Sequence, residues 1–402
     1  MDDPVTAALN RVIDRHSGNT GGAVADYIPE LARADPEAFA VATTSIHGDT
    51  YQAGAYEDEF TIQSVSKPFV FALAVAERGL ENVAAHVGFE PSGEPFNAIS
   101  LEEGTGRPAN PLINAGAIVT TSLVPGDPAE SFERIHTTLS GFAGRTLAVD
   151  EDVFASESAT GDRNRALAYL TLSQGTLGRS AQESTDIYFR QCALQVTVTD
   201  LAVMAATLAN GGVNPVTKRR IVSADIARIT LSLMTTCGMY DRSGEWMVRV
   251  GLPAKSGVGG GIAAVSPGEF GIGVFSPRLD QQGNSVRGLA ALTEMSERLG
   301  LHVFAGAADQ RSPIAASDID TGILSVRLKG EVDFVTAERI TRHLQEMAAT
   351  YPLHEIVLDT ENVTAIRPVG AELVAATIAD LRDRGIAVNA LASSQRSDPF
   401  GA

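Results

Sequence analysis

The stretch "TIQSVSKPFVFALAVA", residues 61–76, decides the fold, because a polar start runs directly into an apolar segment. Pro68 lacks a backbone N–H, which is tolerated in the first turn of a helix, where that donor has no intrahelical partner. We therefore expect a helix to begin near Ser64. The segment "FVFALAVA" (69–76) is apolar on nearly all sides, which indicates a helix buried in the centre of a domain.

Ser64 and Lys67 stand three residues apart at this helix start, a spacing that places both side chains on one face. The lysine amine could then accept the serine proton, and the helix N-terminus would favour a developing alkoxide. Partial burial would favour the neutral amine that a general base requires. A lone Ser-x-x-Lys also arises by chance about once in a chain of this size, so an accidental pairing stays open.

Lysine is scarce in this chain, since 27 of the 31 basic residues are arginines. Lysine can lose its proton near neutral pH in a suitable environment, whereas arginine cannot. The lysines are therefore candidates for chemistry. They are Lys67, Lys218, Lys255 and Lys329.

A second polar motif is "AKSGVGGG", residues 254–261, which contains Lys255, Ser256 and Gly257 at the expected edge of a sheet. A glycine-rich hairpin is the simpler interpretation, and a phosphate loop is disfavoured because the lysine precedes the glycines and no helix follows them. Ser-x-x-Lys on a central helix with Lys-Ser-Gly on an edge strand is the pairing of penicillin-recognising serine hydrolases. Together the two motifs favour a serine-acylation site, in which the charge of Lys255 would help keep Lys67 neutral.

The apolar spacing predicts an α+β domain followed by a smaller module. Strands lie at both ends of the first domain and helices between them, so an N-terminal hairpin is expected to pair with a C-terminal one. The predicted helices are 1–17, 65–79, 129–139, 163–174, 198–210, 222–236 and 287–300. The predicted strands are 38–45, 51–56, 246–251, 262–265 and 269–276.

Residues 305–318, "AGAADQRSPIAASD", are small and polar and are predicted to form a linker. The domains are therefore expected at 1–304 and 319–402. The second is predicted to be a compact βαβ module. Its strands are expected at 322–328, 354–360 and 386–392, and its helices at 336–350 and 369–384.

The composition excludes several classes of function. A net charge of −18 and a pI of about 4.8 disfavour nonspecific binding to nucleic acid or to an anionic membrane. No leader-like start and no apolar run of about 18 residues is present, so we expect a cytoplasmic protein. Cys192 and Cys237 are expected to be buried reduced thiols. The seven histidines show no ligand spacing, so we expect neither a metal nor a cofactor.

From about residue 5 to residue 302 the chain resembles the serine-dependent glutaminases, which have a β-lactamase-like fold with an antiparallel sheet and a helical subdomain. The matching stretches are "ADYIPELA" (25–32), "FTIQSVSKPF" (60–69), "NPLINAGAI" (110–118), "SESATGDRNRALAY" (156–169), "YFRQCAL" (188–194), "TCGMYD" (236–241) and "PAKSGVGGGI" (253–262).

The resemblance implies that Ser64 attacks the side-chain amide of L-glutamine with Lys67 as its base. The backbone N–H groups of Ser64 and Val258 would form the oxyanion hole, and Lys255, Ser256 and Gly257 would support the site. Three tyrosines, Tyr27, Tyr188 and Tyr240, are expected among the catalytic residues. The implied substrate-binding residues are Gln63, Ser64, Asn114, Glu157, Asn164, Tyr188, Tyr240 and Val258.

The residue types agree with an amino-acid substrate. Glu157 can pair an ammonium group, while asparagine amides and tyrosine hydroxyls can donate to a carboxylate. Tyr188 or Tyr240 could relay a proton to the departing ammonia. Two simpler interpretations stay open: Tyr188 as an ordinary residue of an amphipathic helix, and Glu157 as an acid in the first turn of a helix.

The C-terminal module resembles a STAS domain, through "GILSVRLKGEVDF" (322–334) and "EIVLDTENVTAIRPVGAEL" (355–373). Signalling members of that family have Asp-Ser-Ser-Gly where this chain has Arg367, Pro368, Val369 and Gly370. Because Val369 has no hydroxyl, we expect a packing or assembly role in place of a phosphorylation switch.

The sequence analysis favours a cytoplasmic glutaminase that forms a homo-oligomer, a dimer or a tetramer. A penicillin-binding-protein-like hydrolase or esterase would use the same chemistry, and a non-enzymatic regulator built around the C-terminal module would leave the motifs at 60–69 and 253–262 without a purpose. The acidic surface also suggests salt tolerance, although a genome that encodes arginine over lysine would give a similar composition.

Overall fold

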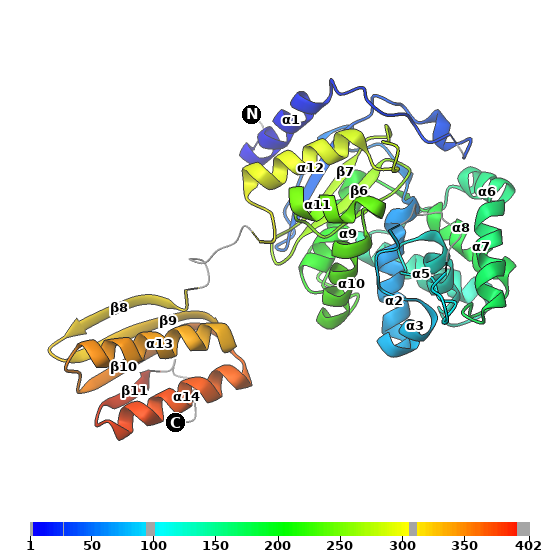
Figure 1. Cartoon of the computed structure of the whole chain (residues 1–402). Coiled ribbons are helices and arrows are strands. Elements are labelled where there is room, and N and C mark those ends of the chain that lie inside the picture. The colour runs from blue at the N-terminus through cyan, green and yellow to red at the C-terminus, as the bar shows by residue number, and fades with distance from the viewer. Residues whose placement is uncertain (1–2, 27, 94–100, 305–311, 392–402) are drawn as a thin grey trace. The chain divides into compact units, whose positions relative to one another are not determined.

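The computed structural model describes residues 3–26, 28–93, 101–304 and 312–391 of the chain (Figure 1). The chain divides into two compact units, Met1–Ala305 and Gly306–Ala402. Each unit is described by itself below. Tyr27, one of the expected catalytic tyrosines, lies outside the described residues, as do residues 305–311 of the expected linker.

The first unit is built on an antiparallel sheet with the strand order β2-β1-β7-β6-β5. The prediction that an N-terminal hairpin pairs with a C-terminal one is confirmed, because β1 pairs with β7 along its whole length. The strands are β1 (Ala40–Ser45), β2 (Thr50–Gly54), β5 (Ala254–Ser256), β6 (Gly261–Ser266) and β7 (Phe270–Phe275).

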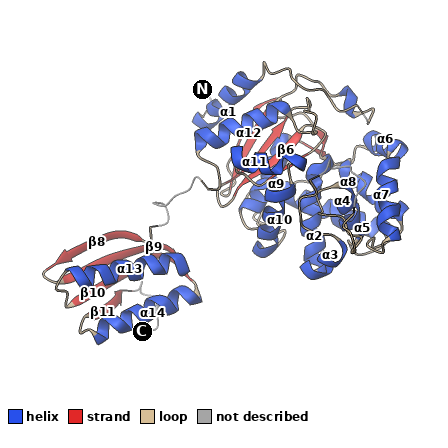
Figure 2. Ribbon diagram, viewed as in Figure 1, coloured by secondary structure: helices blue, strands red, loops and turns tan. Residues whose placement is uncertain are grey.

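Helices cover both faces of this sheet (Figure 2). On one face lie α1 (Pro4–His16) and α12 (Val286–Leu299), whose apolar residues share a core with Val41 and Ile272. On the other face lies α9 (Val198–Ala209), which packs on β7, β6 and β1. Alternate residues of each strand thus enter two different cores, as the period of a strand requires.

Helix α2 (Lys67–Arg78) is the centre of the helical part of this unit. Every residue from Lys67 to Val75 is buried, which confirms the prediction of a central helix. The helices around it include α4, α5 and α10, and a short ladder of β3 (Phe60–Thr61) with β4 (Gln195–Val196) precedes it. The remaining bounds are α3 (Leu80–His86), α4 (Asn114–Ser122), α5 (Pro128–Ala143), α6 (Glu151–Thr160), α7 (Asp162–Ser173), α8 (Ala181–Cys192) and α10 (Ala224–Cys237), with the 3₁₀ turns η1 (Leu31–Arg33), η2 (Gln63–Ser66) and η3 (Tyr240–Arg242).

The strand predicted at 246–251 is wrong, because α11 (Ser243–Arg249) is helical there. Trp246 and Val250 are both buried, and a spacing of four places them on one helical face, while Val248 is 81% exposed. Glu245 pairs with Arg249 at the same spacing. The two valines of "MVRV" (247–250) favour a strand by local propensity, but the burial of Trp246 and Val250 favours a helix, and the packing decides the structure.

The second unit is a four-stranded sheet, in the order β11-β10-β9-β8, with α13 and α14 packed on one face. β9, β10 and β11 are parallel, and β8 is antiparallel to β9. The bounds are β8 (Ile314–Asp320), β9 (Ile323–Val332), α13 (Phe334–Thr350), β10 (Glu355–Ile366), α14 (Pro368–Asp383) and β11 (Ala387–Leu391). Part of the expected linker is thus a strand. The prediction failed because β8 is an edge strand whose residues are mostly exposed and are small or polar at its centre, which leaves no apolar alternation.

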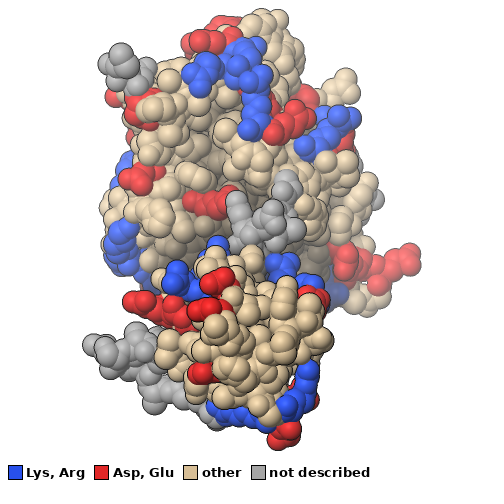
Figure 3. Space-filling model, turned by 90° about the vertical axis from the view of Figure 1, so that its left-hand side faces the viewer, with Lys and Arg blue, Asp and Glu red and all other residues tan. Residues whose placement is uncertain are grey.

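The surface carries both signs of charge. On the face shown in Figure 3, acidic and basic side chains are interspersed. Among the described residues, no helix combines the length and the apolar character that a membrane crossing requires. The same residues include no cluster of His, Cys, Asp and Glu suited to a metal ion.

Two glycines of β7 allow α9 to lie directly on the sheet. A Cβ added at Gly271 would lie 2.0 Å from the Ala206 nitrogen, and one added at Gly273 would lie 2.2 Å from the Val198 carbonyl oxygen. Both obstacles are backbone atoms of a helix, so neither can rotate away. The close approach of α9 therefore depends on these glycines.

We predict that Gly271→Ala destabilises the first unit by about 3 kcal/mol or more, because the added methyl group must displace α9. Gly244→Ala is the control, since its Cβ would meet nothing within 4 Å. The free energy of unfolding can be measured by urea titration with the fluorescence of Trp246, the single tryptophan, which reports on this unit. Equal stability of the two variants would contradict the argument.

Candidate functional site

Ser64 and Lys67 lie where the η2 turn passes into α2. Ser64 is in the 3₁₀ turn, Lys67 is the first residue of α2, and Pro68 follows in its first turn. The predicted helix start is thus confirmed. Ser64 is 5% exposed and Lys67 is 1% exposed, so both polar groups are largely removed from water.

The Lys67 amine is poised to act as a base. Burial lowers its pKa from 10.5 to about 8, although Cys192 and Glu157 act in the opposite direction. Its Nζ donates to Asn114 Oδ1 at 2.7 Å and to the Leu112 carbonyl oxygen at 3.3 Å. A neutral amine has two N–H groups and one lone pair, so these two acceptors leave the lone pair for a proton.

Lys255 occupies the neighbouring edge strand β5 and is also fully buried. Its Nζ lies 4.1 Å from the centre of the Tyr240 ring and donates to the Ser256 carbonyl oxygen. Burial, and secondly the charge of Lys67, lower the pKa of Lys255 well below its usual value. The pKa of Lys67 is thus lowered as expected, but the cause is burial and not the charge of Lys255. Repulsion between the two amines instead lowers the pKa of Lys255.

Tyr240 stands on the far side of the nucleophile. Its hydroxyl interacts with Ser64 and donates to the Ser256 carbonyl oxygen at 3.0 Å. Burial raises the pKa of Tyr240, so the hydroxyl keeps its proton at any physiological pH. Tyr240 can therefore donate a proton near Ser64.

Two residues that contact Ser64, its neighbour Gln63 and Tyr240, have strained backbones. Gln63 has a φ of 49° and Tyr240 has a φ of 56°, in the left-handed region that side chains rarely adopt. Among the described residues only two other non-glycine positions share this conformation, Lys218 and Thr321. Strain of this kind gathers where a fold fixes functional groups.

A polar pocket of about 120 Å³ opens in front of Ser64. Asn114 Nδ2 donates to Asn164 Oδ1 at 2.9 Å, and the Tyr188 hydroxyl lies 3.5 Å from Asn114 Oδ1. The lining residues are Ile28, Gln63, Ser64, Asn114, Glu157, Thr160, Gly161, Arg163, Asn164, Tyr188 and Val258. The pocket thus brings together most of the predicted substrate-binding residues.

Glu157 is the carboxyl group of this pocket. It is 6% exposed, and burial raises its pKa from 4.5 to about 8, although Lys67 and a hydrogen bond with Gln63 act in the opposite direction. Its Oε2 has no hydrogen-bond partner among the described residues. A buried carboxylate oxygen without a partner is costly, so this atom favours a cationic ligand.

One of the two simpler interpretations is wrong, because Glu157 lies in the second half of α6 and not in its first turn. Tyr188, in the middle of α8, is 2% exposed and packs in a core cluster, as an ordinary residue on the apolar face of an amphipathic helix also would. Its hydroxyl lies 3.5 Å from Asn114 Oδ1, and the residue lines the pocket.

The turn after β5 closes the pocket from the opposite side. A Cβ added at Gly257 would lie 3.0 Å from Val65 Cγ2 and 3.2 Å from the Ile62 carbonyl oxygen. The absence of a side chain lets this backbone press against the turn that carries Ser64. Val258, the next residue, lines the pocket, while Ser256 and Lys255 lie behind it, with both side chains fully buried.

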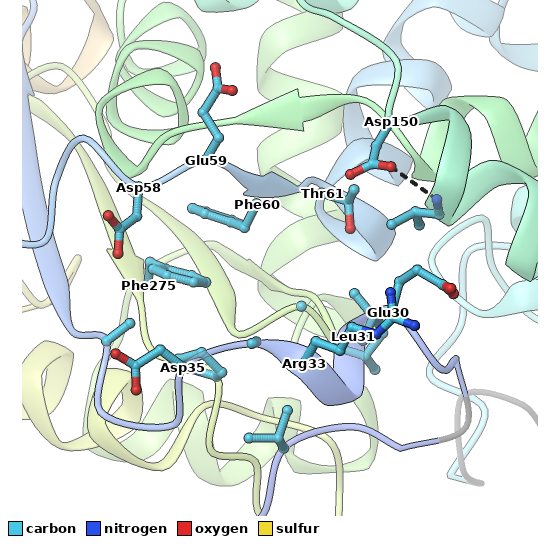
Figure 4. Close-up of a pocket in the computed structure, with 17 residues that line it drawn as sticks. Glu30, Leu31, Arg33, Asp35, Asp58, Glu59, Phe60, Thr61, Asp150 and Phe275 are labelled. Atoms are coloured by element: carbon cyan, nitrogen blue, oxygen red, sulfur yellow. Dashed lines mark hydrogen bonds between the residues drawn. The ribbon is translucent and has the colours of Figure 1, made fainter.

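A larger pocket of about 360 Å³ lies beside the first, and Val258 lines both (Figure 4). Its floor includes the stacked rings of Phe60 and Phe275, with centres 4.0 Å apart. Neither Ser64 nor Lys67 lines it, so the reactive groups belong to the smaller pocket. No sequence motif predicted this second pocket, whose walls combine residues 24 and 30–38 before β1, residues 58–61 around β3 and the start of α6.

Some residues of the site escaped the sequence analysis. The Leu112 carbonyl accepts a hydrogen bond from Lys67, and no pattern of side chains predicts such a backbone contact. Thr160 and Arg163 line the pocket within the quoted stretch 156–169, but helical spacing alone did not distinguish them from their neighbours. The two cysteines are free and buried, as predicted.

Comparison with family models gives one match to each unit. The glutaminase family model matches residues 22–304, and the STAS domain model matches residues 315–396. The α+β, β-lactamase-like fold expected for the first unit and the STAS domain expected for the second are thus confirmed.

Whole relatives and solved structures agree with these matches. "Glutaminase 2" of Bradyrhizobium diazoefficiens is 45% identical over 95% of this chain, which spans 64% of that longer protein. The glutaminase of Corynebacterium glutamicum is 40% identical over 96% of this chain and 93% of its own length. Mglu is similar in structure, with a TM-score of 0.88 and 39% identity over 99% of this chain and all of its own. It has also been solved in a glutamate form. The chain therefore belongs to the glutaminase family and carries a C-terminal STAS domain.

Proposed function

We propose that this protein hydrolyses the side-chain amide of L-glutamine to L-glutamate and ammonia through an acyl-enzyme on Ser64. The observation that carries the proposal is the buried Ser64 three residues before the buried Lys67, whose pKa burial lowers to about 8, in a pocket where Glu157 offers an unpartnered carboxyl oxygen. Membership of the glutaminase family and the glutamate form of Mglu support it.

In the first half-reaction Lys67 takes the proton of Ser64 as its oxygen attacks the amide carbon. The backbone N–H groups of Ser64 and Val258 stabilise the oxyanion. The Tyr240 hydroxyl is protonated and interacts with Ser64, so it can pass its proton to the leaving ammonia and take back the proton that Lys67 received from Ser64; Tyr188 is the second candidate for this role. The C–N bond breaks, and a γ-glutamyl ester of Ser64 remains.

In the second half-reaction water attacks the ester, and Lys67 again accepts the proton. The bond between the acyl carbon and Ser64 Oγ then breaks, Lys67 passes its proton to that oxygen, and glutamate leaves. The two halves therefore use one base and one oxyanion site, and no step calls for a metal or a cofactor.

Substrate recognition is assigned to the polar wall of the pocket. Glu157 pairs the substrate ammonium, which gives Oε2 the partner it lacks. Asn114, Asn164 and Tyr188 face the α-carboxylate, and Gln63 and Tyr27 complete the set by family resemblance. A polar cage of this kind rejects simple amides, since they would leave its buried groups unpaired.

The alternative is a penicillin-binding-protein-like hydrolase or an esterase with the same Ser-Lys chemistry. Glu157 disfavours this alternative, because a buried carboxylate in the pocket binds an ammonium group better than a neutral ester or a β-lactam. A regulator without enzymatic activity would give the buried lysine and the strained turns no role.

We also propose a cytoplasmic location and a homo-oligomer, a dimer or a tetramer. The two free, buried thiols agree with a reducing compartment. For the STAS domain we propose a role in packing or assembly, because position 369 of α14 is a valine that cannot be phosphorylated.

The nucleophile can be tested with Ser64→Ala, for which we predict a loss of ammonia release from glutamine of about 10⁴-fold or more. Ser232→Ala, which removes an exposed hydroxyl, is the control and should keep full activity. Full activity in Ser64→Ala would exclude this nucleophile. Wild-type hydrolysis of a penicillin or a simple ester, without release of ammonia from glutamine, would favour the alternative.

The pH dependence follows from the two shifted groups. Lys67 must be neutral and Glu157 ionised, and both pKa values lie at about 8, so lowering the pH below this value disables both. We predict that kcat/KM falls at least about tenfold per pH unit on this acid side. In Glu157→Gln the slope should be less steep, because only Lys67 titrates. A flat profile between about pH 6 and pH 9 would contradict the assignment.

The ammonium partner can be tested with Glu157→Gln. Because hydrogen bonds to charged groups are worth about 1.5–3 kcal/mol, we predict a rise in KM of about 10- to 100-fold. Glu151→Gln is the matched control on the same helix, where an exposed ion pair with Arg190 contributes little. Equal KM values in the two variants would exclude Glu157 from binding.

A further inference from the structure

The peptide group just before the nucleophile is held by a side chain that the proposed mechanism does not use. Gln63 has a left-handed φ of 49°, and its carbonyl oxygen accepts a hydrogen bond from Ser66 Oγ at 2.7 Å. The carbonyl of Gln63 and the N–H of Ser64 belong to one planar peptide group, in which they point in opposite directions. A bond that fixes this carbonyl therefore also fixes the direction of the Ser64 N–H.

Ser66 is itself held by a chain of buried polar groups. Gln191 Nε2 donates to Ser66 Oγ at 2.9 Å, and Thr121 Oγ1 donates to Gln191 Oε1 at 2.8 Å. All three side chains are fully buried. The directions are consistent along the chain, because each hydroxyl donates its one proton and each acceptor is then satisfied.

This series of hydrogen bonds connects three elements of the fold. Thr121 lies on α4, Gln191 on α8, and Ser66 in the η2 turn, and α8 contacts both of the other elements. Helices α4 and α8 are labelled in Figure 2. Two of the same elements also carry pocket residues, since α4 begins with Asn114 and Tyr188 precedes Gln191 by one helical turn on α8. The turn that carries Ser64 is thus fixed relative to the helices that line the pocket.

The other end of Gln63 is fixed as well. Its side-chain Nε2 donates to Thr61 Oγ1 at 3.2 Å, and its amide also forms a hydrogen bond with Glu157. Ser66, Gln191 and Thr121 do not line the pocket. They therefore touch neither the substrate nor the reacting atoms.

We infer that Ser66, Gln191 and Thr121 are positioning residues that hold the strained Gln63–Ser64 peptide, so that the Ser64 N–H points into the oxyanion site. This inference rests on the proposed function, in which that N–H is an oxyanion donor. Loss of the Ser66 hydroxyl frees the peptide to rotate out of its left-handed conformation. The effect falls on the transition state and therefore on kcat, since Glu157, Asn114 and Asn164 stay in place and the Gln63 side chain keeps its bonds to Thr61 and Glu157.

The test is Ser66→Ala, compared with wild type and with Ser184→Ala. Ser184 is a matched control, because it is a fully buried serine on α8 whose hydroxyl, within the part of the chain that the structure describes, donates to the Ser180 carbonyl at the start of the same helix. We expect Ser66→Ala to lower kcat for glutamine by about 10- to 10³-fold, up to the loss of a whole oxyanion donor, with KM within about twofold of wild type. Ser184→Ala should keep both constants.

Gln191→Met is the second variant and keeps the length of the side chain without its polar atoms. It should lower kcat in the same direction, and the double variant Ser66→Ala/Gln191→Met should lose less than the product of the single losses, because both act through one chain. Near-UV circular dichroism shows which variants are folded, and kcat is compared among those.

The outcomes separate the two proposals. A wild-type protein that released no ammonia from glutamine would refute the proposed function. An active wild type with an unchanged kcat in folded Ser66→Ala, or with the same small loss as in Ser184→Ala, would overturn the positioning role and leave the proposed function intact. A rise in KM at constant kcat would also overturn it, since that result places Ser66 in substrate binding.

Discussion

The burial of the Lys67 amine is the constraint around which the first unit is arranged. A charged amine without water is unfavourable unless it is paired or loses its proton, and here burial lowers its pKa to about 8. Two acceptors then satisfy its N–H groups, one from the start of α4 and one from the backbone before it.

The segment before α4 is shaped to present those acceptors. Asn110 Oδ1 accepts from the N–H groups of Leu112 and Ile113, which curls the chain so that the Leu112 carbonyl faces Lys67. Gly116 allows this, since a Cβ there would lie only 1.9 Å from the Asn110 carbonyl oxygen. The stretch "NPLINAG" (110–116) thus positions the hydrogen-bond acceptors of Lys67. A substitution at Gly116 would displace the Leu112 carbonyl, although Gly116 itself does not bond to the amine.

The sequence predicted the parts of the site that depend on local rules. Pro68 placed the start of α2, and Ser64 and Lys67 followed from it. The sequence could not predict the assembly of the pocket, because α4 and α8 bury hydroxyl and amide side chains among their apolar residues, and α6 buries only Val153 and Glu157, so that none of the three shows a clean apolar stripe. Likewise, the bond between Ser66 and Gln191 joins residues 125 positions apart, and nothing in either local stretch announces the other.

Strain explains why so much buried polar structure surrounds one serine. A left-handed Gln63 and a left-handed Tyr240 each cost on the order of 1–3 kcal/mol, and they persist only where the surroundings over-determine them. At Gln63 the carbonyl and the side chain are both bonded, and at Tyr240 the hydroxyl is tied to β5 while its carbonyl accepts from Ser243 Oγ. Groups already fixed in direction need no reorganisation when charge develops on the substrate oxygen. The cost of the two strained residues is therefore offset by folding, before the substrate binds. In this way the packing of the helical part prepares the chemistry at Ser64.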